Sequence, residues 1–266
     1  MIIRRSLLIL IALIAFTLAA SAHDTWLIPR SFSIRTGTKV LLDLTSGMSF
    51  PTLDTSIKRD RIDVARVRIN GRVTDITNLA SKRNSLSLLA QVNDAGTAVC
   101  WIDLKPRQLE LTPDLVEEYF AEIDASREIR EAWQNMKAPK RWREVYVKHA
   151  KTYVKVGENS ADNSWSEPVG MSLEILPLSD PTSLKEGDAF AVRVLKNGVP
   201  YPNFPVGLVL QGTSKGSFRT TDNEGRAVFV MFRTGKYLLR GTDLRRSDKP
   251  DLEWESDFTT LTVEVR

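Results

Sequence analysis

His23 would combine two metal-binding groups in one residue if the chain were cleaved directly before it. Basic residues precede an apolar run over 7–18, and a small-residue site typical of signal peptidase ends at Ala22. Cleavage there would give His23 a free α-amine beside its imidazole. Amine and imidazole nitrogens suit Cu(II), Ni(II) or Zn(II). The sequence therefore predicts a signal peptide over residues 1–22 and a metal ligand at the new terminus.

Two other residues could add to such a site. His149 is the second of two histidines in the chain. Together with His23 it would supply three nitrogens in a histidine brace, which resembles the sites of copper-binding periplasmic proteins and copper monooxygenases. Asp24 could occupy a further position. The alternative interpretation of His149 is a packed, hydrogen-bonded core histidine, because it shares a predicted helix face with apolar residues.

Charge and hydropathy restrict the class of protein. The chain has 37 Lys and Arg against 33 Asp and Glu, and removing residues 1–22 lowers the net charge from +4 to +2. Nucleic-acid binding needs a clustered excess of basic residues, so no nucleic-acid partner is expected. No second apolar run approaches the length of a membrane span, so we expect no transmembrane segment after cleavage. The protein is expected to be periplasmic or secreted.

Motifs of covalent catalysis are not found in the sequence. Cys100 is the only cysteine and lies in an apolar, strand-like run, which predicts a small buried hydrophobe without a disulfide partner. There is no Gly-x-Ser-x-Gly elbow and no glycine loop that could cradle a phosphate. We therefore expect a protein that is not an enzyme.

Apolar alternation and turn residues predict a mainly β chain. Alternation over 40–45 indicates a strand with one buried face. Asn70-Gly71 and Asn197-Gly198, each between apolar runs, predict tight hairpins. Short strands separated by turn residues recur from Met171 to the end, as is typical of an antiparallel sandwich.

Helical patterns interrupt the strands. Thr112-Pro113-Asp114 supplies a cap, a first-turn proline and an acid for a first helix, and a second is expected over 126–136. A third is predicted after Pro139, where four residues recur at i, i+3, i+4 and i+7: Trp142, Val145, Tyr146 and His149. The basic residues between Lys137 and Lys151 are then expected on the solvated faces of this helix.

These elements predict two antiparallel immunoglobulin-like sandwich modules with a helical insertion. The N-terminal module is expected over 23–168, with the insertion at about 113–152, and the C-terminal sandwich over 169–266. The polar stretch 157–168 would link them. A fragment from about Met171 is expected to fold alone.

Three stretches resemble a known family. They are His23-Asp24-x-Trp26-Leu27-x-Pro29, Pro168-Val169-Gly170-Met171-x-Leu173-Glu174-Ile175-x-Pro177, and Thr221-Asp222-x-x-Gly225-Arg226-Ala227-x-Phe229. The chain resembles secreted bacterial proteins of unknown function once labelled periplasmic nickel/cobalt-uptake components, along nearly the whole predicted mature chain. The third stretch is also similar to transthyretin-like and collagen-adhesin B-type repeats, which implies an immunoglobulin-like sandwich at the C-terminus.

The chain departs from this family where metal chemistry is implied. Many members have Gly-His-x-Phe-Pro where this chain has Gly47-Met48-Ser49-Phe50-Pro51, and a second histidine near Gly241-Thr242 is absent. Both losses would weaken a nickel or cobalt site made of imidazoles. A thioether is a soft ligand, so Met48 would shift the preference towards Cu(I).

The sequence and the resemblance together predict an exported periplasmic accessory protein that binds or delivers Cu, Ni or Co. The predicted ligands are His23, Asp24, His149 and Met48, and the expected partner is an envelope metal transporter. The alternative is a non-catalytic envelope scaffold or a carbohydrate-binding module that holds no metal.

Overall fold

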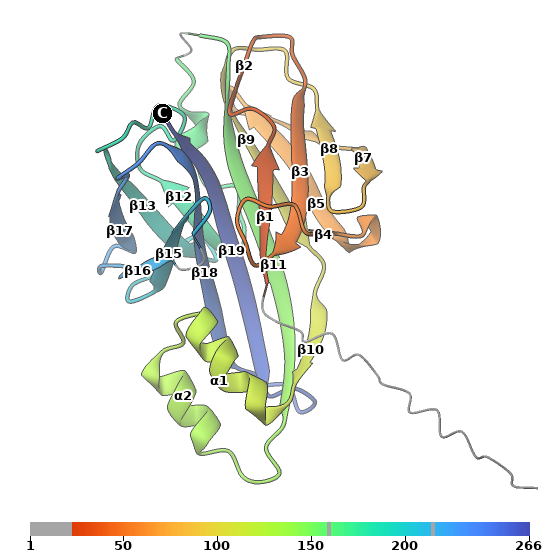
Figure 1. The fold of residues 1–266 in the computed structure, drawn as a ribbon, viewed down its shortest axis with the longest axis vertical. Coiled ribbons are helices and arrows are strands. Elements are labelled where there is room, and N and C mark those ends of the chain that lie inside the picture. Colours follow the sequence, from red (N-terminus) through yellow and green to blue (C-terminus); the bar gives the residue numbers. More distant parts are fainter. Residues whose placement is uncertain (1–22, 159–160, 214–215) are drawn as a thin grey trace, which may run out of the picture.

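In the described part of the chain, the computed structural model shows three β-sheets and two α-helices (Figure 1). The structure describes residues 23–158, 161–213 and 216–266. The predicted signal peptide, residues 1–22, lies outside the described residues. The chain is mainly β, as predicted from its alternating pattern.

The first sheet contains strands from the N-terminal part of the chain, in the order β1-β3-β8-β7 with β4 beside β3. Its strands are β1 (Asp24–Pro29), β3 (Val40–Gly47), β4 (Thr55–Ser56), β7 (Asn78–Ser81) and β8 (Leu86–Ala90). The strand predicted over 40–45 is confirmed as β3. Its Leu42 and Leu44 are buried against Cys100 and Ile102 of the second sheet, which closes an N-terminal core.

The second sheet extends through both halves of the chain. Its main path is β16-β15-β18-β19-β11-β9-β5-β6, with β2 and β10 beside β11. Its strands are β2 (Ser33–Ile34), β5 (Ile62–Ile69), β6 (Arg72–Asp75), β9 (Gly96–Leu104), β10 (Arg107–Leu111), β11 (Trp142–Val156), β15 (Pro205–Leu210), β16 (Ser217–Thr220), β18 (Gly235–Arg246) and β19 (Trp254–Val265).

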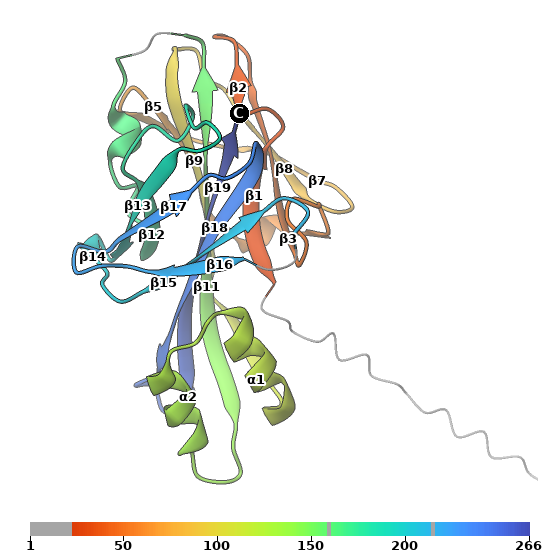
Figure 2. The same cartoon turned by 60° about the vertical axis from the view of Figure 1, so that its left-hand side comes forward.

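The join between the two halves of this sheet is a parallel ladder. β11 pairs with β19 from Glu144 opposite Trp254 to Thr152 opposite Thr262, and Figure 2 shows the two long strands side by side. The predicted modules therefore share one sheet. The stretch 157–168 divides them in sequence but not in hydrogen bonding.

The third sheet packs over the C-terminal half of the second and forms a sandwich with it. Its strands are β12 (Leu173–Pro177), β13 (Ala189–Lys196), β14 (Val199–Pro200) and β17 (Arg226–Val230). The core between the sheets contains Phe190, Tyr237 and Leu261, all fully buried. Val99 of β9 and Tyr153 of β11 belong to the same core, so the N-terminal part of the chain contributes to it.

Both predicted Asn-Gly hairpins are present. Asn70 and Gly71 have φ angles of 50° and 72° between β5 and β6, and Asn197 and Gly198 have 50° and 80° between β13 and β14. Two successive residues with positive φ define the turn that matches the twist of paired strands, and asparagine and glycine adopt it at low cost.

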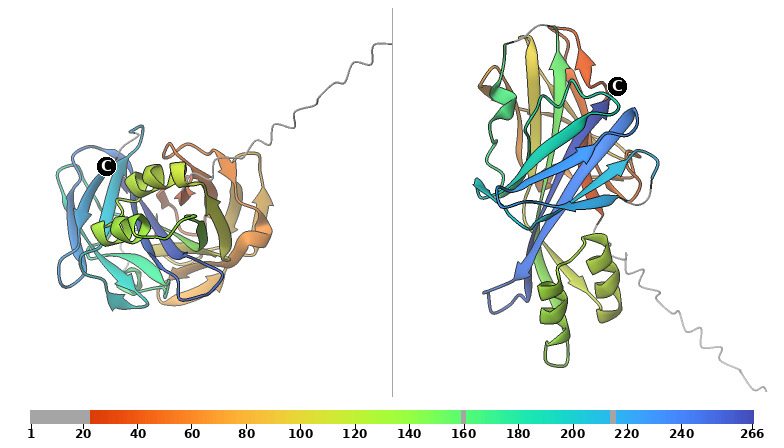
Figure 3. Two further views of the ribbon diagram at one scale, coloured as in Figure 1. Left: turned by 90° about the horizontal axis from the view of Figure 1, so that it is seen from below. Right: turned by 90° about the vertical axis from the view of Figure 1, so that its left-hand side faces the viewer.

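The first two predicted helices are confirmed as α1 (Pro113–Glu122) and α2 (Arg127–Gln134). Ser126 caps α2, since its hydroxyl accepts from the Ile129 amide at 3.4 Å. Both helices cover one end of the long strands, as the view from below in Figure 3 shows. Their apolar faces pack on Trp142, which stacks on Trp254 with ring centroids 4.6 Å apart.

The third predicted helix is wrong, because residues 142–156 form the 15-residue strand β11. The predicted helical insertion at about 113–152 therefore ends with α2. A strand buried on both faces does not show polar alternation, so the spacing of its large residues coincided with a helical repeat. The expected solvated basic face is only partly present. Lys137 and Arg141 are exposed. Lys151 is not, because its Nζ lies 2.6 Å from Glu174 Oε1 and both side chains are 1% exposed.

We predict that the isolated fragment 169–266 is less stable than the protein over residues 23–266. The fragment lacks β11, so one edge of β19 becomes open, and it also lacks Val99 and Tyr153 from its core. Thermal unfolding followed by circular dichroism should give a clearly lower Tm for the fragment. Equal Tm values would show that the shared sheet adds no stability.

Candidate functional site

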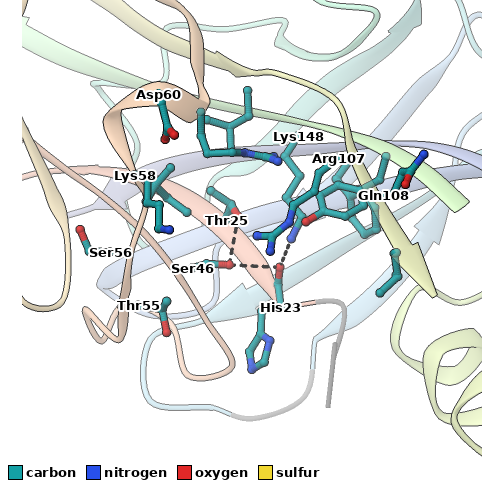
Figure 4. Close-up of a pocket in the computed structure, with 16 residues that line it drawn as sticks. His23, Thr25, Ser46, Thr55, Ser56, Lys58, Asp60, Arg107, Gln108 and Lys148 are labelled. Carbon is teal, nitrogen blue, oxygen red and sulfur yellow. Dashed lines mark hydrogen bonds between the residues drawn. The ribbon is translucent and has the colours of Figure 1, made fainter. Parts of the chain in front are cut away.

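A cavity of about 730 Å³ lies beside His23, at the start of β1. Figure 4 shows side chains from several strands and loops around it. Four basic side chains line it, namely Lys58, Arg61, Arg107 and Lys148. The rings of Tyr146 and Phe258 form part of its apolar wall, together with Ile57, Leu104 and Leu109.

The pairing of the long strands positions these groups. Tyr146 and Lys148 are two residues apart on β11, so their side chains leave the same face of the sheet. Arg107 of β10 is paired with Tyr146, and Phe258 of β19 is paired with Lys148. Cross-strand partners lie on one face, which brings two cations and two aromatic rings together.

The N-terminal strand is anchored across this sheet by side-chain hydrogen bonds. Thr260 Oγ1 of β19 donates to the carbonyl oxygen of Thr25 at 2.6 Å, and Thr262 Oγ1 donates to that of Leu27 at 2.6 Å. Lys148 Nζ donates to the carbonyl oxygen of His23 at 2.5 Å. The start of β1 is thus fixed at the edge of the cavity.

Lys148 is a cation without a carboxylate within 4.0 Å in the described part of the chain. Its Nζ lies 5.5 Å from the ring centroid of Tyr146 and 5.0 Å from that of Phe258. Burial lowers the pKa of Lys148 to about 8, although the charges of Asp24 and Glu122 oppose this change. Aromatic faces attract the ammonium group but do not neutralise its charge.

The other three basic side chains also lack a carboxylate partner within 4.0 Å in residues 23–158, 161–213 and 216–266: Lys58, Arg61 and Arg107. Burial lowers the pKa of Arg61, and the like charge of Arg107 acts in the same direction. Asp60 is the one acidic residue in the described lining. An excess of positive charge around a partly apolar cavity favours an anionic ligand.

Asp24 and Met48, two of the predicted metal ligands, occupy different environments. Asp24 Oδ2 lies 2.5 Å from Arg240, so this carboxylate is already engaged in an ion pair. Met48 is 64% exposed. The ladder between β1 and β3 ends with Asp24 opposite Gly47. His23 directly precedes β1 and Met48 directly follows β3, so the two residues lie at the same end of this strand pair.

His149 is buried on the other face of β11 from Lys148, because successive residues of a strand point to opposite faces. Since Lys148 reaches the His23 carbonyl, the structure does not bring His149 to His23. No group of three or more His, Cys, Asp or Glu suited to a metal ion is found in the described residues. The four predicted ligands are therefore not assembled into one site.

His149 belongs to a buried charge network whose members come from distant segments of the chain. Its Nδ1 lies 2.6 Å from Asp103 Oδ1, and its Nε2 lies 2.8 Å from Ser172 Oγ. The order Asp-His-Ser resembles a hydrolytic triad. Ser172, however, donates its hydroxyl proton to Asp257, and Lys196 Nζ is 2.5 Å from the same carboxylate. The imidazole is therefore a double donor that links Asp103 of β9 to the Ser172 hydroxyl, which in turn donates to Asp257 of β19.

The electrostatics of this network favour the charged imidazole. Burial alone would lower the pKa of His149, but the hydrogen bond to Asp103 and the negative charges of Asp103 and Asp257 outweigh it and raise the pKa. Burial alone would raise the pKa of Asp257, whereas the nearby His149 and the hydrogen bonds from Lys196 and Ser172 hold this pKa far below its usual range. The packed, hydrogen-bonded histidine described as the alternative interpretation corresponds to this arrangement.

Cys100 is fully buried, as predicted, and burial raises the pKa of its thiol to about 12. It is therefore a thiol at neutral pH and lacks the exposure that a reactive cysteine needs.

The cationic lining of the cavity was not predicted from the sequence. Lys148 was assigned to a solvated helix surface, and Arg61 and Arg107 lie in separate segments that only the strand pairing brings together. One local signal was available: Tyr146, Lys148 and Ala150 fit a strand face with spacing of two.

Residues 20–242 match the model of a family described as a domain of unknown function, DUF4198, and the chain belongs to that family. No curated protein matches the sequence. None of the helices in the described residues is long and apolar enough to cross a membrane.

Several solved structures are similar to this chain at low identity. A DUF4785 family protein from Legionella pneumophila is 13% identical, with 80% of this chain and 50% of that chain covered and a TM-score of 0.27. The D0-D1 domain of intimin is 14% identical, with 90% and 96% covered and a TM-score of 0.23. The Yersinia pseudotuberculosis adhesin InvE is 11% identical, with 91% and 58% covered and a TM-score of 0.24. The chain spans about half the length of the Legionella protein.

We predict that His149 makes stability depend on pH. Because its folded pKa is raised, its contribution is complete below the unfolded pKa of about 6.5 and is lost as the pH rises through the folded value. His149→Gln should lower the free energy of unfolding by about 3 kcal/mol near pH 6, since it leaves Asp103 without its cationic partner, whereas Asp257 keeps Lys196 and Arg245. The difference from wild type should shrink at higher pH in urea unfolding curves. A pH-independent difference would contradict the charged imidazole.

Proposed function

We propose that this chain is an exported, non-enzymatic binding protein whose cavity takes an organic anion. The observation that carries the proposal is that four basic side chains, without carboxylate partners within 4.0 Å among the described residues, converge on a cavity with aromatic walls. A ligand carboxylate would form charge-assisted hydrogen bonds with Lys148 and Arg107. The rings of Tyr146 and Phe258 would contact its apolar part.

We predict that Arg107→Ala weakens the binding of phthalate and citrate at least tenfold, which corresponds to about 1.4 kcal/mol. The cause is the loss of a guanidinium that has no carboxylate within 4.0 Å in the part of the chain that the structure describes. The measurement is isothermal titration calorimetry at low salt on protein that begins at His23. Arg72→Ala is the matched control, because Arg72 is an exposed arginine on β6 outside the lining.

Two results would contradict this proposal. One is the absence of binding to both anions at millimolar concentration. The other is an equal loss of affinity in Arg107→Ala and Arg72→Ala, since that would reduce binding to nonspecific attraction by net charge.

A second candidate function is the binding of copper, nickel or cobalt by the mature terminus, with delivery to an envelope transporter. The specific observation in its favour is that His23, just before β1, and Met48, just after β3, lie at the same end of these two paired strands. After cleavage, His23 would offer an amine and an imidazole, and Met48 a soft thioether. His149 and Asp24 are left out of this site because of their other contacts.

We predict that protein beginning at His23 binds Cu(II) more tightly than protein with one added residue before His23. The extension replaces a basic amine with a poor amide donor and leaves the imidazole intact. Competition with a coloured chelator measures both affinities, and intact mass confirms each terminus. Equal affinities would exclude the terminus as a chelating site.

We also propose an immunoglobulin-like C-terminal module, a periplasmic location and an association with nickel or cobalt. The strands β12 to β19 support an immunoglobulin-like C-terminal module, and the resemblance supports a periplasmic location and the nickel/cobalt association. A scaffold without a ligand is the outcome if both binding experiments fail.

A further inference from the structure

We infer that the cavity receives a metal ion as an anionic chelate, in which the carboxylates of a small organic acid contact the basic side chains and His23 completes the metal coordination. This inference rests on the proposed binding of an organic anion. It names the ligand class, a metal–polycarboxylate complex, that fits both the charge of the cavity and the residue at its edge.

The charge of the cavity argues against a bare metal ion. Lys58, Arg61, Arg107 and Lys148 surround the space, with Asp60 as the acidic member of its described lining. A divalent cation entering alone would be repelled by these side chains, whereas a complex with net negative charge would be attracted. One divalent ion bound to one citrate trianion carries such a charge.

The donor set of the protein is too small for a metal alone. His23 can provide an imidazole and, after cleavage, an amine, and the described residues hold no cluster of three or more His, Cys, Asp or Glu suited to a metal. Cu(II) prefers a tetragonal set of nitrogen and oxygen ligands. Carboxylate oxygens from the organic acid would therefore supply the positions that the protein leaves open.

The position of His23 would keep metal coordination by its imidazole apart from the contacts between the carboxylates and the basic side chains. Its carbonyl oxygen accepts from Lys148 and from Ser46, at 2.5 and 3.5 Å, and this holds the residue against the cavity. Figure 4 shows the imidazole directed away from that carbonyl and from Arg107. A metal bound by His23 would thus lie at the edge of the cavity, with the carboxylates extending towards the cations.

The test compares three titrations of protein that begins at His23: citrate alone, Cu(II) alone, and the one-to-one Cu(II)–citrate complex. We expect the complex to bind at least tenfold more tightly than citrate. Electron paramagnetic resonance should show nitrogen coupling on the copper of the bound complex, with citrate retained in stoichiometric amount after gel filtration.

Variants separate the contributions. His23→Ala should reduce the ratio of complex affinity to citrate affinity to near one, because the imidazole is lost. Arg107→Ala should weaken both citrate and the complex at least tenfold. Arg72→Ala should change neither, since this exposed residue is outside the cavity.

The outcomes distinguish this inference from the proposed function. If citrate binds but the complex binds no better and its copper shows only oxygen ligands, the chelate inference is overturned and anion binding stands. If copper leaves citrate and binds the protein alone, the inference is overturned in favour of the His23–Met48 site. If neither citrate nor the complex binds, both proposals fail.

Discussion

The parallel pairing of β11 with β19 is the constraint on which the rest of the structure depends. It joins sheets that would otherwise belong to two separate sandwiches, and it places a single strand in contact with three cores. Because both faces of β11 are covered, its polar residues must find partners inside the protein. Lys151 forms an ion pair with Glu174, His149 forms a hydrogen bond with Asp103, and Lys148 donates to the His23 carbonyl oxygen at the cavity.

These three residues show how one strand produces two kinds of environment. On one face, Lys151 and His149 are matched by buried carboxylates, so their charges stabilise the junction between the halves. On the other face, Lys148 has aromatic neighbours and no carboxylate within 4.0 Å among the described residues. A charge left without a partner beside a cavity indicates a ligand, whereas a matched charge indicates structure. The charge of Lys148 at the candidate site is thus not neutralised by a described carboxylate, whereas the charges of Lys151 and His149 in the buried network are.

Local sequence rules predicted the local structure of this protein. The Asn-Gly turns and the helices α1 and α2 were found because a few adjacent residues determine them. β11 was missed because its burial comes from both sides, and this depends on strands that are distant in the sequence. The cavity was missed for the same reason, since Arg61, Arg107 and Lys148 meet only through strand pairing. The predicted metal site of His23 with His149 is not formed, because successive residues of a strand point to opposite faces. Lys148 points towards His23, so His149 points away from it.

We propose that the cavity beside His23 binds an anion between aromatic walls and basic side chains. A crystal structure of the mature protein with 4-bromobenzoate tests it most directly, because anomalous scattering from bromine locates the ligand. We expect the ring near Tyr146 and Phe258 and the carboxylate within hydrogen-bonding distance of Lys148 or Arg107. Bromine found only at other positions, with the cavity free of the probe at saturating concentration, would contradict the account.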